Sequence, residues 1–307
     1  MHDIAPPEKS AKQALTAAFT LIEMSIVLVI IGMIVGGILV GQSLINAAAM
    51  RAQISQIEKY NTAVNTFYTK YNCLPGDCAN AGSLGFAARG SNPGQGDGNG
   101  IIQGSQGTGN GYFEGGGETV MLWMDLSQAG LIAGNFNSAS STVSATITTA
   151  NAGSYFPAAQ IGGGNYIYAW SGGYNQGQST LAPDGINYFG LSSAVTVGSY
   201  VYSSPGLTVA QAYAIDTKVD DGFPQSGKVM AMYLQFQSGQ FVTWGAGGGN
   251  MGASGANHGP TTSATAGSST TCYDNGGVSG PTTYSMEQNS GTGINCALSF
   301  IMQGAAR

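Results

Sequence analysis

The sequence has very little charge. Asp, Glu, Lys and Arg make up 8% of its 307 residues, and their balance gives a net charge of -6. A chain so poor in Lys and Arg presents no basic field to a phosphate backbone, so nucleic-acid binding is not indicated. A sparsely charged surface rich in Gly, Ser, Thr and Asn is more typical of an extracellular or assembled protein than of a cytosolic enzyme.

Histidine is also scarce, since His2 and His258 are its two occurrences. Nucleophilic catalysis needs a base close to the nucleophile. No Ser, His and Asp set, and no Cys and His pair, suggests such a site, so we do not expect an enzyme. The Gly-rich stretch from 82 to 117 has no following Lys-Ser or Lys-Thr pair, so a surface loop is favoured there over a phosphate-binding loop.

One long stretch lacks charge altogether. From Met24 to Met50 there is no Asp, Glu, Lys, Arg or His. As a helix, this run extends over roughly 40 Å, which exceeds the roughly 30 Å of bilayer hydrocarbon. Glu23 lies at its start, and an isolated carboxylate there requires a cationic partner.

The residues around Glu23 also carry a family resemblance. Phe-Thr-Leu-Ile-Glu, starting at Phe19, together with the apolar run resembles the amino terminus of type IV pilins and of the pseudopilins of type II secretion. The resemblance implies that a prepilin peptidase cuts between Ala18 and Phe19 and methylates the new amine of Phe19. It also implies that Glu23 pairs with the amine of a neighbouring subunit. The chain departs from the family pattern at Ala18, where Gly is usual, and at Val40, where many members have Pro.

The resemblance implies a structural subunit, pilin or pseudopilin, of a type IV pilus-like or type II secretion filament. Its partners would be pilin-like subunits of the same or another kind, the prepilin peptidase and the inner-membrane assembly machinery. Lys9 and Lys12 precede the apolar run, which keeps the leader cytoplasmic. We therefore expect a single-pass protein of the bacterial inner membrane that moves into a periplasmic or cell-surface filament.

Two other interpretations stay open. The run could anchor an extracytoplasmic binding or adhesion protein that never polymerises. It could also be a secretory signal cut after the alanines at 47–49, although the apolar core of a signal peptide is shorter, at roughly 7 to 15 residues.

The expected fold is α+β and pilin-like. It comprises a leader at 1–18, a membrane-spanning or filament-core half-helix at 19–50, an amphipathic half-helix at 51–72, and a globular periplasmic or extracellular domain at 73–307. Apolar residues at three- and four-residue spacings extend the helix to Tyr71, before Pro75 and Gly76. The second half of this helix should pack on an antiparallel sheet with Gly-rich loops.

Further elements follow from local patterns. A short helix is expected at 118–132, with Trp123 in the core, and another after Thr208 as N-cap, ending before Gly222. A hairpin is expected from 228–237, Ser238-Gly239 and 240–244, central to the sheet. Other strands are expected at 143–148, 166–170, 187–191 and 195–202.

Four cysteines in an extracytoplasmic chain predict disulfides. Of three possible connectivities, spacing favours the local one, which pairs Cys73 with Cys78 and Cys272 with Cys296. The Cys-x4-Cys spacing lacks a second Cys or His pair, so a structural metal site there is not favoured.

One acidic cluster is a candidate metal site. Asp216, Asp220 and Asp221 gather near a helix end, and such oxygen clusters can hold Ca²⁺, as in loop sites of some secretion pseudopilins. The spacing does not match an EF-hand, and a solvated helix end is the alternative. We expect no other cofactor.

Overall fold

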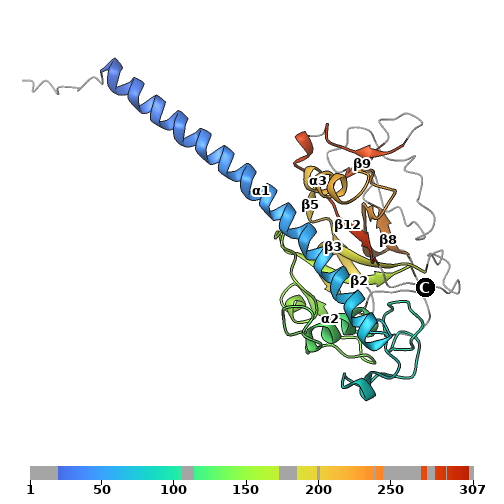
Figure 1. The fold of residues 1–307 in the computed structure, drawn as a ribbon. Coiled ribbons are helices and arrows are strands. Elements are labelled where there is room, and N and C mark those ends of the chain that lie inside the picture. Colours follow the sequence, from blue (N-terminus) through green and yellow to red (C-terminus); the bar gives the residue numbers. More distant parts are fainter. Residues whose placement is uncertain are drawn as a thin grey trace, which may run out of the picture. The chain divides into compact units, whose positions relative to one another are not determined.

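The computed structural model describes residues 20–105, 114–172, 185–198, 201–237, 240–244, 271–274, 281–287 and 289–303. The chain forms two compact units, residues 1–47 and 48–307. The first is helical where it is described, and the second combines helices with an antiparallel sheet (Figure 1). The α+β expectation is therefore confirmed.

Helix α1 (Leu21–Tyr71) has the length expected from the sequence. In the first unit its large apolar side chains are exposed throughout, from Leu21 at 88% to Ile45 at 69%. Among the described residues, nothing covers this half of the helix, so its apolar surface is suited to another apolar environment.

From Ala48 onward, α1 belongs to the second unit and packs on it. Its buried side chains recur every three or four residues, which places them on one face of the helix. These residues are Gln53, Gln56, Ile57, Tyr60, Ala63, Val64 and Phe67. The expected packing of this half against the domain is confirmed.

Aromatic rings join this face to the rest of the core. Tyr60 lies edge-on to Trp123 of helix α2 (Glu118–Gln128), with ring centroids 5.0 Å apart. Trp123 in turn lies 5.8 Å from Phe189 of strand β3 (Asn187–Val197). Trp123 is fully buried, as its sequence context predicts. Helix α2 ends four residues before the expected 132, because Gly130 adopts a left-handed φ of 70°.

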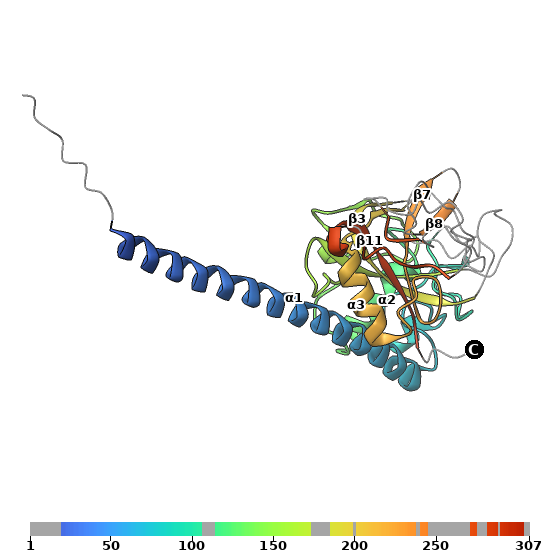
Figure 2. The ribbon, with the colours of Figure 1, turned by 90° about the horizontal axis from the view of Figure 1, so that it is seen from above.

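Helix α3 (Val209–Val219) begins as the sequence predicts. The Thr208 hydroxyl accepts from the Gln211 peptide N–H, and the Gln211 side chain accepts from the Thr208 N–H. This is a capping box. Figure 2 shows α3 near the C-terminal part of α1, and residues of both helices line one groove.

The main sheet has eight antiparallel strands among the described residues, with the path β6-β12-β3-β4-β7-β8 and with β1 and β2 also paired to β3. Figure 1 shows β3 close to β2 and β12. The strands of this sheet are β1 (Ile147–Thr148), β2 (Asn165–Ser171), β3, β4 (Val201–Ser204), β6 (Val229–Met230), β7 (Met232–Gln237), β8 (Gln240–Trp244) and β12 (Leu298–Ile301). Two small sheets pair β9 (Tyr273–Asp274) with β10 (Thr283–Tyr284), and β5 (Leu207–Thr208) with β11 (Ile294–Cys296). Short 3-10 turns lie at η1 (Ala81–Leu84), η2 (Ala152–Ser154) and η3 (Asn289–Gly291).

Two strand predictions are wrong. The expected strand at 195–202 is the reversal between β3 and β4, because Val197 pairs with Val201 and Thr196 with Tyr202. The hairpin of β7 and β8 forms, but it lies at one end of the strand path, whereas β3 is central. The alternation of apolar and polar residues within a segment predicts a strand but does not specify which strands lie beside it. The position of the β7–β8 hairpin in the sheet therefore could not be read from its own sequence. The expected turn residues Ser238 and Gly239 lie outside the described residues.

Two other strand boundaries also differ. Only Ile147–Thr148 of the expected strand at 143–148 is paired, and the expected strand at 228–237 is divided into β6 and β7 at Ala231. The predicted strands at 166–170 and 187–191 lie within β2 and β3.

Two buried glutamines of α1 hold the segment that borders β2. The Gln56 amide donates to the Ala158 carbonyl at 2.9 Å and accepts from the Gln160 N–H at 2.9 Å. The Gln53 side-chain oxygen Oε1 accepts from the Ile161 N–H at 3.1 Å. Ala158 pairs with Tyr166 of β2, so these amides join the helix to a strand edge.

Candidate functional site

The first candidate site is the start of α1. Glu23 Oε2 accepts hydrogen bonds from the Thr20 N–H at 2.8 Å and from the Thr20 hydroxyl at 2.7 Å. The Glu23 N–H donates to the Thr20 hydroxyl oxygen at 3.3 Å, which completes a capping-box pattern. The carboxylate is thus at the first turn of an apolar helix, as expected. Ala18 and Phe19, where the processing site is predicted, lie outside the described residues.

The apolar part of α1 is long and hydrophobic enough to cross a membrane once. Its most apolar window of 18 residues has a mean hydropathy of 2.7, and none of that window is buried in the protein. In the described chain it is the one helix with this property.

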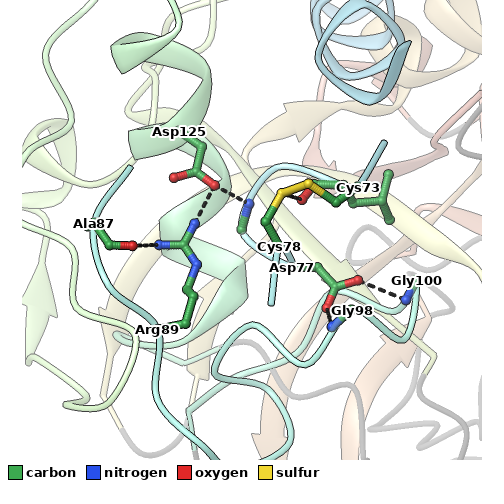
Figure 3. Close-up of a disulfide and its surroundings, with 10 residues drawn as sticks. Cys73, Asp77, Cys78, Ala87, Arg89, Gly98, Gly100 and Asp125 are labelled. Atoms are coloured by element: carbon green, nitrogen blue, oxygen red, sulfur yellow. Dashed lines mark hydrogen bonds and ion pairs between the residues drawn. A yellow bond between two sulfur atoms is a disulfide. The ribbon is translucent and has the colours of Figure 1, made fainter. Parts of the chain in front are cut away.

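A second candidate site lies at the end of α1, and part of it is shown in Figure 3. It consists of the loop between Cys73 and Cys78, which includes Gly76 and Asp77, and of Glu118 and Asp125 of α2; we call this group of residues the polar hub. Cys73 and Cys78 are joined by a disulfide, which closes a short loop over Leu74, Pro75, Gly76 and Asp77. The Gly76 N–H donates to Asp125 Oδ2 of α2 at 2.7 Å. Gly76 has a φ of 87°, and a Cβ there would lie 2.6 Å from the Glu118 carbonyl oxygen. Only glycine allows the loop to approach α2 this closely.

Two carboxylates of the hub hold the Gly-rich loop. Asp77 accepts from the Gly98 N–H at 2.7 Å and from the Gly100 N–H at 2.8 Å. Glu118 accepts from the Gly96 N–H at 2.8 Å and from the Gln103 N–H at 2.9 Å. The bonds to Glu118 satisfy the peptide N–H groups of Gly96 and Gln103, which are buried, and the bonds to Asp77 fix the more exposed peptides of Gly98 and Gly100.

The expectation of a surface loop at 82–117 is therefore wrong for part of it. Ile101, Ile102 and Gln103 are at most 2% exposed, and Glu114 is also buried. The carboxylates of Asp77 and Glu118 make this burial feasible, because they accept the peptide N–H groups of the loop.

A buried ion pair borders the hub. Arg89 contacts the Asp125 carboxylate, and both side chains are at most 2% exposed. The Arg89 guanidinium also donates to the Ala87 carbonyl at 2.9 Å. The pair joins the first part of the Gly-rich stretch to α2, and the guanidinium compensates part of the buried negative charge of Asp125.

Burial dominates the electrostatics of the hub. It raises the pKa of Asp77 from 3.8 to about 7, against the lowering effect of the two peptide N–H donors. Burial, and next the nearby charge of Asp77, raises the pKa of Glu118 well above its ordinary value. Burial also raises the pKa of Asp125, even with Arg89 beside it.

Oxygen atoms of Asp77, Asp97 and Glu118 lie within 4.8 Å of one another. Peptide N–H groups already occupy the oxygens of Asp77 and Glu118, and Asp97 accepts from the Asn99 side chain at 2.8 Å. We assign this cluster the role of holding the loop. Sequence reasoning missed it, and the available signal was an Asp directly after Pro75-Gly76 inside the Cys-x4-Cys pair.

The predicted calcium residues do come together, with carboxylate oxygens of Asp216, Asp220 and Asp221 within 4.8 Å. Groups of the protein itself donate hydrogen bonds to these carboxylates. Asp216 is buried and accepts from the Tyr284 hydroxyl and the Gly222 N–H, and burial raises its pKa to about 7. Calcium at this cluster stays a prediction.

The other two members of that cluster, the partly buried Asp220 and the exposed Asp221, bond to the loop that follows. Asp221 accepts from the Phe223 N–H at 2.8 Å and from the Ser226 hydroxyl at 2.7 Å. Asp220 accepts from the Lys228 N–H. These contacts organise the turn from α3 into β6, which is the role expected of a helix-end network.

The second disulfide joins Cys272, next to β9, to Cys296 of β11. Both bonds are the pairs that spacing favours. This one ties the C-terminal strands together across 24 residues of sequence.

Comparison with known proteins adds no assignment. No protein-family model, no curated protein and no solved structure matches the chain.

Proposed function

We propose that the chain is a pilin-like filament subunit, inserted in the membrane through α1 before assembly. The observation that supports it most is the first half of α1, which exposes its apolar side chains on all sides and carries Glu23 at its first turn. A helix that is apolar all round is suited to lipid or to a bundle of like helices.

Within this proposal, prepilin peptidase cuts between Ala18 and Phe19, and Glu23 pairs with the methylated amine of Phe19 in a neighbouring subunit. The helices then form the filament core, and the domain after Ala48 forms its surface. The chain contributes structure and contacts rather than catalysis.

The rival interpretation is a single-span anchored protein that binds a target without polymerising. It uses the same helix but has no use for a carboxylate at its start or for a free amine on Phe19. Processing and assembly therefore distinguish the two.

The first test is the intact mass and amino-terminal peptide of the mature protein. We expect a chain that begins at methylated Phe19. A start after Ala49, or an uncut Met1, contradicts the proposal.

The second test replaces Glu23 by Val. The variant should insert as well as the wild type or better, because a polar group leaves an apolar run. Assembly should fall, since a buried amine without its partner typically costs about 3 to 5 kcal/mol, which corresponds to roughly two to nearly four decades in an equilibrium. The control Glu58→Val changes an exposed carboxylate of the same helix and should insert and assemble normally.

The measurement separates membrane fractions from sheared or secreted filaments. Processed Glu23→Val protein should accumulate in the membrane and be depleted from filaments. Equal incorporation of the Glu23→Val variant and the wild type would favour the anchored binding protein.

A further inference from the structure

Asn99 and Gly100 lie in the Gly-rich loop, next to the carboxylates of the hub. The Gly100 N–H donates to Asp77 Oδ2 at 2.8 Å. The Ile101 N–H donates to Asn99 Oδ1 at 2.7 Å, and Asn99 Nδ2 donates to Asp97 Oδ2 at 2.8 Å. Both side-chain polar atoms of Asn99 and the peptide nitrogen of Gly100 therefore have a specific partner.

These contacts match the requirements of one reaction. A peptide nitrogen that attacks the preceding Asn side chain needs a base for its proton, a donor to the carbonyl oxygen and a group beside the departing amine. Asp77, the Ile101 N–H and Asp97 are placed at these three positions. We propose that Asn99–Gly100 is a self-modification site, at which the Gly100 nitrogen attacks Asn99 Cγ and expels ammonia.

The step balances without a cofactor. The bond from Gly100 N to Asn99 Cγ forms, and the bond from Asn99 Cγ to Nδ2 breaks. The proton that the Gly100 nitrogen loses is the one that the departing amine gains, with Asp77 and Asp97 as carriers, whose carboxylates lie within 4.8 Å of each other. The product is a cyclic succinimide, which water opens to aspartate or isoaspartate.

Local structure supports the attack. The bond from the Ile101 N–H to Asn99 Oδ1 folds the side chain over the intervening peptide, and Gly100 has no Cβ to obstruct it. Burial raises the pKa of Asp77 to about 7, so its carboxylate is a stronger base than an ordinary aspartate and is about half ionised at neutral pH.

The test compares the full chain in detergent when folded and when unfolded in guanidinium, at neutral pH in a chelating buffer. Peptide mapping over time quantifies the loss of one ammonia at Asn99 and the later gain of a carboxyl group. The same dipeptide occurs at Asn110–Gly111 and Asn275–Gly276, outside the described residues, and these steps serve as references within each sample.

We expect Asn99 to convert at least about tenfold faster in the folded chain than in the unfolded chain, a threshold set below the range of about 10² to 10⁴ that is typical of general-base assistance. Hydrogen bonds that merely immobilise Asn99 would make the folded chain slower. An equal or slower rate in the folded chain overturns the proposal.

A variant pair tests the base. Asp77→Asn should reduce the folded rate at Asn99 towards the unfolded rate. The control Asp274→Asn changes another buried carboxylate, which accepts from the Ser285 hydroxyl, and should leave that rate unchanged. A folded Asp77→Asn protein that converts Asn99 at the wild-type rate refutes the assignment, and if this variant does not fold, the wild-type comparison alone decides. The inference does not depend on filament assembly.

Discussion

Asp77 should make the folded domain less stable as the pH rises. Its pKa is about 7 in the folded chain against an ordinary 3.8, so between these values the folded state keeps a proton that the unfolded state has lost. The free energy of unfolding then falls by about 1.4 kcal/mol per pH unit. Over the whole window from about pH 4 to about pH 7, the loss from this one group is on the order of 4 kcal/mol.

The assay is guanidinium unfolding followed by tryptophan fluorescence, because Trp123 is buried in the core. Measurements run in steps across the pH window, in a chelating buffer, on the wild type and on Asp77→Asn. The free-energy difference, wild type minus variant, should decrease by this amount as the pH rises and should stay constant above about pH 7.

Asp274→Asn is the matched control, because it also replaces a buried carboxylate by an amide. Other buried carboxylates, such as Glu118 and Asp216, contribute equally to wild type and variant unless they couple to Asp77. A difference for Asp77→Asn that is independent of pH, or that grows with pH, would refute the reasoning.

The remaining predictions concern the ion pair and the disulfides. Asp125→Ala leaves Arg89 buried without its partner and should lower the free energy of unfolding by about 3 to 5 kcal/mol, whereas Glu58→Ala on the exposed face should change it by about 0.5 kcal/mol or less. Chemical unfolding of both variants measures this, and a small loss for Asp125→Ala would show that water reaches Arg89. Loss of the Cys272–Cys296 bond by Cys272→Ser should cost about 3.5 kcal/mol and loss of Cys73–Cys78 by Cys73→Ser about 2 kcal/mol, because the longer loop restrains the unfolded chain more. Non-reducing peptide mapping checks the pairs, and a larger loss for Cys73→Ser would contradict the loop-entropy estimate.

The parts of the fold that depend on local pattern could be predicted from the sequence. The length of α1 follows from its uncharged run and from the spacing of Ile57, Val64 and Phe67. The start of α3 follows from Thr208 and Gln211, which satisfy each other's backbone groups within one turn. Such interactions span a few residues, so a short window contains all the information they need.

The polar hub could not be predicted in this way. Asp77 contacts peptides 21 and 23 residues further along the chain, and Gly76 contacts Asp125 across 49 residues. From composition alone, the Gly-rich stretch is predicted to be a surface loop. Only the folded chain shows that carboxylates distant in sequence accept hydrogen bonds from its peptide N–H groups. The place of β3 at the centre of the sheet is non-local for the same reason.

The two buried glutamines of α1 also define how the domain carries mechanical load. A force applied along α1 reaches the sheet through the bonds from Gln56 to Ala158 and Gln160 and from Gln53 to Ile161. From there it passes to β2 through the bond between the Ala159 N–H and the Asn165 carbonyl. These bonds reach one short segment beside β2 and add to the apolar packing of Tyr60, Val64 and Phe67, so separating the helix from the sheet requires both to be broken. The glutamines thus couple the helix mechanically to the sheet.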